Sequence, residues 1–155
     1  MPLFSEKSLV EDYFIQKLQE KGWKFIQADN LERENLEEPL LTPTLIRALK
    51  RLNAGIGVGD EEIKQVLNEL KLRTSGSEDA KKILNYLKDG IPIKFEKERV
   101  VKYIRLFDYN NTQNNDKIQN NDFTISRQVI HQSGHKQIRN DIILYINGIP
   151  IANIE

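Results

Sequence analysis

Two carboxylates flank an apolar hairpin near the end of the sequence, and such a pair can bind a metal ion. Asp141 opens the apolar run 141–146, and Glu155 follows the second apolar run, 149–154. The Asn-Gly dipeptide between the runs is typical of a tight β-turn. Runs that are apolar on both faces are typical of strands central to a sheet. The pattern therefore predicts that two acids distant in sequence meet at one end of a sheet.

The length of the hairpin loop decides whether the two acids share a face. With a strict two-residue turn, Asp141 lies opposite Ile154 and Glu155 points to the other face, because side chains alternate along a strand. With a three-residue loop of residues 147–149, Asp141 pairs with Glu155, and Ile142 pairs with Ile154. A three-residue loop with a glycine at positive φ is a common hairpin form, and the proline after it needs no ladder partner. We favour the three-residue loop.

The run from Arg139 to Glu155, RNDIILYINGIPIANIE, resembles a block of the type I restriction endonuclease R subunit. That block reads R-P-D, a hydrophobic strand, N-G-x-P, a second hydrophobic strand and E-x-K. The resemblance implies a PD-(D/E)XK nuclease domain in which Asp141 and Glu155 are catalytic and bind Mg²⁺. Asn140 stands where the family has proline. The family's lysine would follow the last residue given, so we expect an amino-terminal part of a longer protein.

Glu11 is a third candidate acid with two interpretations. It borders the apolar stripe of a predicted helix, and Ser8-Leu-Val-Glu11 also matches a capping box. Spacing alone leaves both open. The family carries a glutamate in this helix shortly before a Gly-aromatic pair like Gly22-Trp23, which favours a catalytic role. Glu6 and Asp12 are lesser candidates.

Gln128 and Arg139 are polar candidates near the two acids. In the family a glutamine follows an N-x-F pattern like Asn121 and Phe123, which implies a catalytic Gln128 that contacts the metal-bound water or the DNA backbone. Most side-chain hydrogen bonds serve structure, so an amide bonded within the sheet is the alternative. Arg139 is either a phosphate contact or the ion-pair partner of Asp141.

Helices come first in the sequence and strands follow, which predicts an α+β fold. The resemblance specifies a restriction-endonuclease-like core, with a mostly antiparallel or mixed sheet flanked by amino-terminal helices. We expect residues 1–155 to form the amino-terminal part of one nuclease domain. The expected helices start near Ser5 or Ser8, Thr42, Asp60 and Ser77, and the expected strands span 23–26, 91–95, 100–109, 123–130, 141–146 and 149–154, with the later strands in one antiparallel meander.

Composition narrows the function classes. The 23 Lys and Arg residues balance 23 Asp and Glu residues, so charge gives no general argument for nucleic-acid or membrane binding. The absence of cysteine excludes disulfides and thiolate metal sites. No apolar run approaches the roughly 18 residues of a membrane span and no signal peptide is evident, so we expect a cytoplasmic protein without membrane contact. The glycine-rich run 53–59 lacks a Lys-Ser/Thr pair and is not a phosphate loop.

Together, these expectations predict that the protein hydrolyses double-stranded DNA with Mg²⁺. The resemblance further implies ATP-driven translocation by domains outside this chain, and assembly with modification and specificity subunits. Two alternatives remain open from the sequence: another nuclease of the same fold, of the repair or junction type, and a catalytically inactive interaction module.

Overall fold

The computed structural model describes residues 5–72, 77–109 and 120–155, and its chain divides into two compact units. Unit 1 comprises Met1–Leu45 and Asp122–Glu155, and unit 2 comprises Ile46–Asn121. Unit 2 is therefore an insertion in the sequence of unit 1. Both units contain helices and strands, which confirms the α+β class. The polar, low-complexity run 110–122, for which the sequence predicts a loop, lies mostly outside the described residues.

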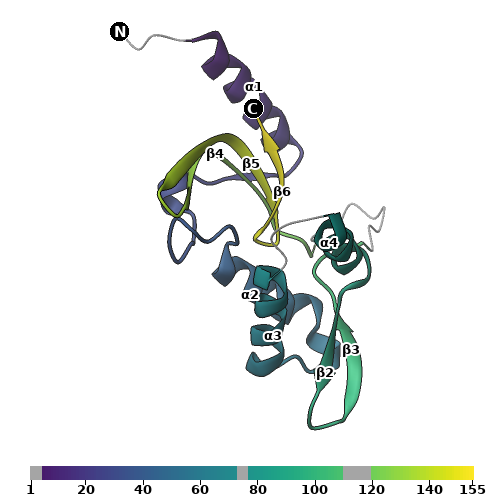
Figure 1. Cartoon of the computed structure of the whole chain (residues 1–155). Coiled ribbons are helices and arrows are strands. Elements are labelled where there is room, and N and C mark those ends of the chain that lie inside the picture. Colours follow the sequence, from purple (N-terminus) through teal and green to yellow (C-terminus); the bar gives the residue numbers. More distant parts are fainter. Residues whose placement is uncertain (1–4, 73–76, 110–119) are drawn as a thin grey trace. The chain divides into compact units, whose positions relative to one another are not determined.

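Unit 1 is built on a four-stranded sheet with the order β1-β4-β5-β6, of which Figure 1 labels β4, β5 and β6. β1 runs parallel to β4, and the other neighbours are antiparallel, so the sheet is mixed. The short strand predicted after the first helix is therefore confirmed, as a parallel edge strand. The elements of unit 1 are α1 (Glu6–Glu20), β1 (Lys24–Phe25), the 3-10 turn η1 (Ala28–Asn30), β4 (Phe123–Ser133), β5 (Lys136–Ile146) and β6 (Ile149–Ile154).

The two faces of this sheet have separate apolar cores. On one face, α1 packs through Ile15 against Ile125 and Ile142. On the opposite face, Val129 and Tyr145 are covered by the segment between β1 and α2, which contributes Leu31 and Leu41. Coverage on both faces explains why the hairpin strands are apolar on both sides.

α1 begins at a serine cap and not at a capping box. The Ser5 side chain accepts a hydrogen bond from Ser8 N at 3.1 Å, and Ser8 Oγ donates to Ser5 O at 2.9 Å. The capping-box interpretation of Ser8 and Glu11 is therefore wrong. Glu11 lies in the second turn of α1, where it is buried against the sheet.

The β5–β6 hairpin confirms the predicted register but not the predicted loop. Ile146 pairs with Ile149, so the turn has two residues, Asn147 and Gly148, both at positive φ. The three-residue loop was wrong. A bulge restores the register that it would have given, because Leu144 pairs with Ala152 while Tyr145 pairs with Pro150, and Ile151 is the extra residue. Beyond the bulge Ile142 pairs with Ile154, as predicted.

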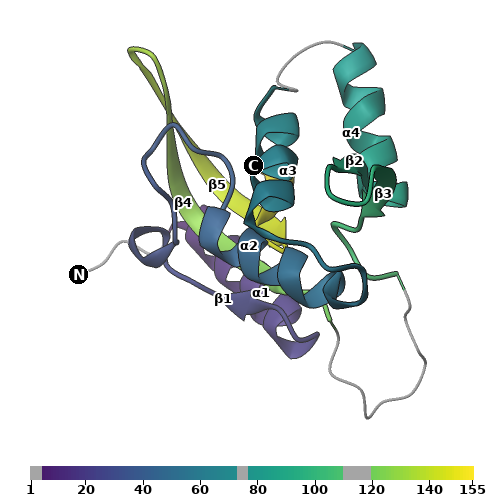
Figure 2. The same cartoon turned by 90° about the horizontal axis from the view of Figure 1, so that it is seen from below.

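β4 and β5 continue beyond β6 as a two-stranded ribbon (Figure 2). The segment before α2 supports this ribbon, because Arg33 Nη1 donates to Ile130 O at 2.8 Å and Gln132 N donates to Leu36 O at 2.9 Å.

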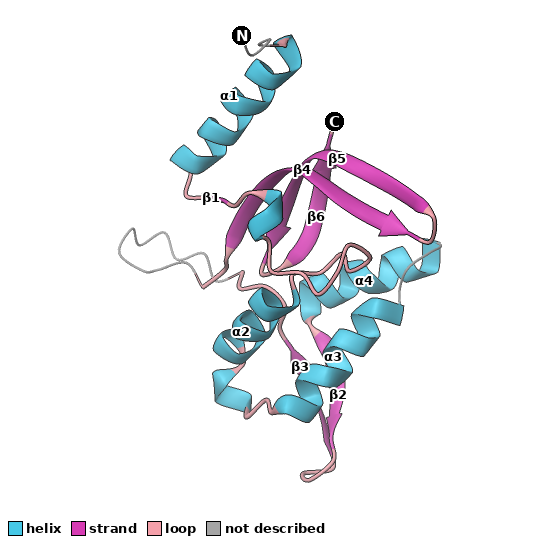
Figure 3. Ribbon diagram, turned by 90° about the vertical axis from the view of Figure 1, so that its left-hand side faces the viewer, coloured by secondary structure: helices cyan, strands magenta, loops and turns pink. Residues whose placement is uncertain are grey.

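Unit 2 has its own two-stranded sheet, formed by the β2–β3 hairpin (Figure 3). The prediction of one meander through all later strands was therefore wrong. The remaining elements are α2 (Thr42–Leu52, which starts in unit 1), the 3-10 turn η2 (Ala54–Ile56), α3 (Asp60–Leu72), α4 (Ser77–Asp89), β2 (Ile91–Phe95) and β3 (Val100–Ile104).

Three local predictions in and around unit 2 also fail. β3 ends at Ile104 because the Asn53 side chain bonds both the N–H and the carbonyl of Arg105, at 2.8 and 2.9 Å. Leu84, which helical spacing predicts on the buried face of α4, is 52% exposed. Thr42, which the Thr-Pro pair predicts as the cap of α2, has a buried hydroxyl without a hydrogen-bond partner among the described residues, so it does not cap the helix. Within the described residues, no helix is long and apolar enough to cross a bilayer.

Candidate functional site

Four carboxylates, three of them the main candidates, line one cavity of about 460 Å³ between α1, the middle of β5 and the end of β6. Glu11 comes from the helix, Asp141 from β5, and Glu155 directly follows β6. Figure 1 shows the carboxyl-terminal end of β6 beside α1. We call this cavity the carboxylate pocket; its other lining residues are Glu6, Lys7, Val10, Phe14, Ile142 and Ile154. The predicted convergence of two hairpin acids and one helix acid on a shared cavity is thus present.

A slip in side-chain alternation brings Asp141 into the pocket. Ile142 packs on the α1 side of the sheet, so strict alternation would turn Asp141 to the opposite side. Asp141 nevertheless lines the carboxylate pocket, and it is Asn140 that lines a cavity on the opposite face. Two successive side chains of β5 therefore face α1.

Side-chain alternation is also interrupted in β4, at a residue with a strained backbone that stands across from Asp141. Arg127 and Gln128 both bond to Glu11, while Val129 belongs to the opposite core. Gln128 has a φ of 55°, a left-handed conformation that is unfavourable for a residue with a Cβ. Because Arg127 pairs with Ile142 and Val129 with Asn140, Gln128 stands across from Asp141. The two slips therefore coincide at the pocket.

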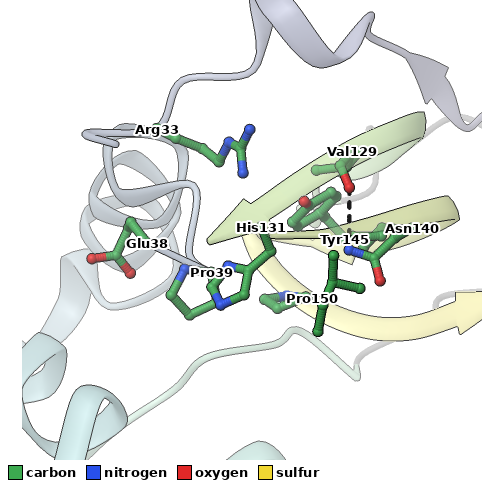
Figure 4. Close-up of a pocket in the computed structure, with 10 residues that line it drawn as sticks. Arg33, Glu38, Pro39, Val129, His131, Asn140, Tyr145 and Pro150 are labelled. Atoms are coloured by element: carbon green, nitrogen blue, oxygen red, sulfur yellow. Dashed lines mark hydrogen bonds between the residues drawn. The ribbon is translucent and has the colours of Figure 1, made fainter. Parts of the chain in front are cut away.

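Figure 4 shows the opposite face, where Val129, His131 and Asn140 surround a second cavity. Asn140 Nδ2 donates to Val129 O at 3.2 Å, which joins the two strands just past the slip. The volume of this cavity is about 180 Å³, well below that of most small-molecule sites. We therefore place the candidate site on the α1 side.

Glu11 is held by two side chains of β4. Arg127 Nη2 lies 2.9 Å from Glu11 Oε2, and Gln128 Nε2 lies 3.4 Å from each carboxylate oxygen. Arg127 also pairs with Asp12, the neighbouring acid on α1. The Glu11 side chain is only 8% exposed, so Arg127 compensates a buried charge. No sequence motif indicates Arg127, although it precedes the candidate Gln128 directly.

Lys7 supplies a second cation, inside the pocket. Its Nζ lies 2.8 Å from Asp141 Oδ2. This hydrogen bond raises the pKa of Lys7, and the charges of Asp141 and, less strongly, Glu11 and Glu155 raise it further. Lys7 was not among the predicted site residues, yet it lies four residues before Glu11, and that helical spacing places both on one face of α1. Arg139 is exposed, and the ion pair of Asp141 is with Lys7 instead.

The donor set suits a hard divalent cation held by two carboxylates. In the described part of the chain, no group of three or more His, Cys, Asp and Glu side chains is arranged to hold a metal. Mg²⁺ commonly takes only one or two protein carboxylates and keeps several waters. Asp141 already attracts a cation, since the Lys7 ammonium bonds to it. Asp141 and Glu155 therefore fit Mg²⁺, whereas Glu11 is engaged by Arg127.

The comparison with known families assigns the class of protein. Residues 3–155 match the family described as "Type I restriction enzyme R protein N terminus", and the chain belongs to that family. This confirms the resemblance found in the hairpin sequence.

Two curated relatives come from Methanocaldococcus jannaschii. One, named "Putative type I restriction enzyme MjaVIIIP endonuclease subunit", is 33% identical over 144 residues, which cover 90% of this chain and 13% of the relative. The other, named "Putative type I restriction enzyme MjaIXP endonuclease subunit", is 26% identical over 167 residues, covering 97% of this chain and 15% of the relative. The chain thus spans about one seventh of the length of these relatives. No solved structure matches it.

Proposed function

We propose that this chain is the DNA-cleaving part of a type I restriction enzyme R subunit, with a restriction-endonuclease-like core and its active site in the carboxylate pocket. The observation that supports this most strongly is the bulged register, which brings the acids flanking the Asn-Gly hairpin onto the cavity that Glu11 also lines. The family membership and the names of both relatives agree with an endonuclease subunit.

Each side chain of the pocket has a separate task in this proposal. Asp141, from the middle of β5, and Glu155, directly after β6, would hold Mg²⁺. When bound there, the ion would supply an acidified water and would neutralise charge on the scissile phosphate. Glu11 orients water at the rim of the site, and Arg127 and Gln128 fix its carboxylate. Gln128 thereby acts through Glu11.

The proposed substrate, partner subunits and use of ATP follow from membership in the type I family. The cleaved substrate is double-stranded DNA in the cytoplasm. The modification and specificity subunits are the partners, and the specificity subunit reads the sequence. ATP enters only through domains outside this chain, where its hydrolysis drives translocation along DNA.

The test is cleavage of a supercoiled plasmid with Mg²⁺ by the longer protein that contains this chain, assembled with its partner subunits. Asp141→Asn and Glu155→Gln should each reduce cleavage at least about a hundredfold, because even residues behind the metal ligands cost 10- to 100-fold. ATP hydrolysis should stay within about twofold of wild type, because these acids belong to the nuclease site.

Glu20→Gln is the matched control. Glu20 is an exposed acid of α1 that pairs with Lys17, outside the pocket, and the change removes the same charge. It should leave cleavage unchanged. Cleavage that survives in both pocket variants would refute the assignment.

A second candidate, an inactive module of the same fold, is favoured by one observation. Lys7 forms an ion pair with Asp141 and Arg127 forms one with Glu11, so two of the three main candidate acids are already neutralised by side chains. Wild-type protein that is folded and assembled but cleaves no DNA with Mg²⁺ or Mn²⁺ would support this candidate.

A further inference from the structure

The carboxylate pocket contains a cation of its own, on the residue that the proposed function assigns to the metal. Lys7 Nζ bonds to Asp141 Oδ2 at 2.8 Å. The second cation at the site, Arg127, is bound to Glu11 and Asp12. Lys7 is therefore the cation positioned to affect Asp141 directly.

The two partners of this pair are held very differently. The Asp141 side chain is 17% exposed and fixed on β5, whereas the Lys7 side chain is 64% exposed and reaches the carboxylate on a flexible stem from the first turn of α1. An exposed ion pair contributes little to stability, since solvent screens it and ordering the stem costs entropy. The contact can therefore break without unfolding the helix or the sheet.

An ammonium and a divalent cation cannot share this oxygen. Mg²⁺ requires its oxygen ligands at about 2.0–2.1 Å, so an ammonium on the same oxygen would lie within a few ångströms of the ion. Repulsion between a single and a double positive charge at that separation exceeds the attraction of one exposed ion pair. Metal binding to Asp141 thus requires the ammonium to leave.

We propose that Lys7 competes with the divalent metal ion for Asp141 and so sets the metal affinity of the carboxylate pocket. The inference rests on the proposed function, which makes Asp141 a metal ligand. Lys7 is a positioning residue in this account, because it acts on the metal through Asp141. Without metal it balances the negative charge of Asp141, Glu11 and Glu155 in the pocket.

The experiment measures binding of Mn²⁺ alone to the 155-residue chain, from the paramagnetic resonance signal of free Mn²⁺. Lys7→Gln should bind Mn²⁺ about two- to fivefold more tightly than wild type. This change corresponds to the free energy of an ordinary exposed ion pair, which in wild type competes with the metal for Asp141. Lys7→Arg keeps a cation within reach of Asp141 and should bind within about twofold of wild type.

Lys17→Gln is the charge-matched control, because Lys17 lies on the same helix, pairs with Glu20 and is outside the pocket. Its Mn²⁺ affinity should equal that of wild type. Circular dichroism of each variant verifies that the chain is folded.

The outcomes separate the inference from the function on which it rests. Wild-type binding that is lost in Asp141→Asn, together with unchanged or weaker binding in Lys7→Gln, would overturn the inference and leave the proposed site intact. Absence of Asp141-dependent Mn²⁺ binding in both wild type and Lys7→Gln would overturn the proposed site and the inference together.

Discussion

The backbone of Gln128 is strained, and this strain accompanies the unusual strand geometry at the pocket. Its φ of 55° lies in a strand, directly across from Asp141. A residue with a Cβ in this conformation costs about 1–2 kcal/mol, and such strain is concentrated at functional sites. The strain turns Gln128 toward Glu11, so it serves the site and not the regular ladder.

The strain predicts an inverted order of stability for two substitutions. Gln128→Ala and Gln128→Gly both remove the amide that contacts Glu11, but only glycine relieves the backbone. We expect Gln128→Gly to be more stable than Gln128→Ala by about 1 kcal/mol. Urea unfolding followed by the fluorescence of Trp23, the single tryptophan, measures the difference.

Ile130, on the same strand, is the control position. Its φ is not in the positive region, and it is paired regularly with Arg139. There glycine should be less stable than alanine, because glycine weakens a regular strand. The same order at both positions would show that Gln128 is not strained.

At the scale of elements, the β5–β6 turn fixes the register on which the pocket depends. Asn147 is fully buried, and its side chain accepts a hydrogen bond from Asp122 N at 2.7 Å. Gly148 O accepts from Leu41 N at 2.8 Å. The Asn-Gly turn is therefore anchored in the core of unit 1, and Gly148 approaches neighbouring backbone closely.

Gly148→Ala should destabilise the protein by about 2–4 kcal/mol, from overpacking added to left-handed strain. The new Cβ would lie 2.5 Å from Leu41 O and 2.9 Å from Leu45 N, and φ is 80°. Thermal unfolding measures the loss. Gly134→Ala, in the β4–β5 turn, is the control: its φ is 61°, but among the described residues no other heavy atom lies within 4 Å of the added Cβ. Equal losses for both variants would contradict the close approach.

The sequence predicts the parts of this hairpin that depend on local pattern, and fails where the backbone departs from it. Apolar runs and the Asn-Gly pair correctly predict two strands and the pairing of Ile142 with Ile154. The bulge at Ile151 has no compositional signature, so the same register was attributed to a longer loop. The left-handed conformation of Gln128 is equally impossible to predict from the sequence, because glutamine is not a residue type that indicates a positive φ.

Long-range arrangement was also beyond the sequence pattern, apart from one missed signal. Neither the parallel pairing of β1 with β4 nor the separation of the β2–β3 hairpin follows from periodicity, because each depends on which distant segments meet. Lys7, in contrast, could have been found from its four-residue spacing to Glu11. The catalytic roles of Asp141, Glu155, Glu11 and Gln128 remain predictions until the substitutions are made.

At the scale of the whole molecule, every residue of the carboxylate pocket belongs to unit 1, although unit 2 interrupts its sequence. The two points where the chain leaves and re-enters unit 1 are close together. Leu45 N is 2.9 Å from the Cβ position of Gly148, and Asp122 O accepts from Asn147 N at 2.8 Å. Both ends thus flank one turn, and a short linker can join them.

We therefore expect unit 1 to fold when Ile46–Asn121 is replaced by a short Gly-Ser linker. Closing a shorter loop costs less entropy, which offsets part of the stability lost where α2 is cut. Trp23 lies in unit 1, with its ring centroid 5.0 Å from that of Phe123, so its fluorescence reports on this unit alone. The variant should show one cooperative unfolding transition and keep the Mn²⁺ affinity of the intact chain.

A second variant that replaces only residues 54–119 retains α2 and tests whether the helix cut is responsible for any loss. If neither variant shows a cooperative transition of Trp23, the two units fold as one, and the pocket depends on the insertion.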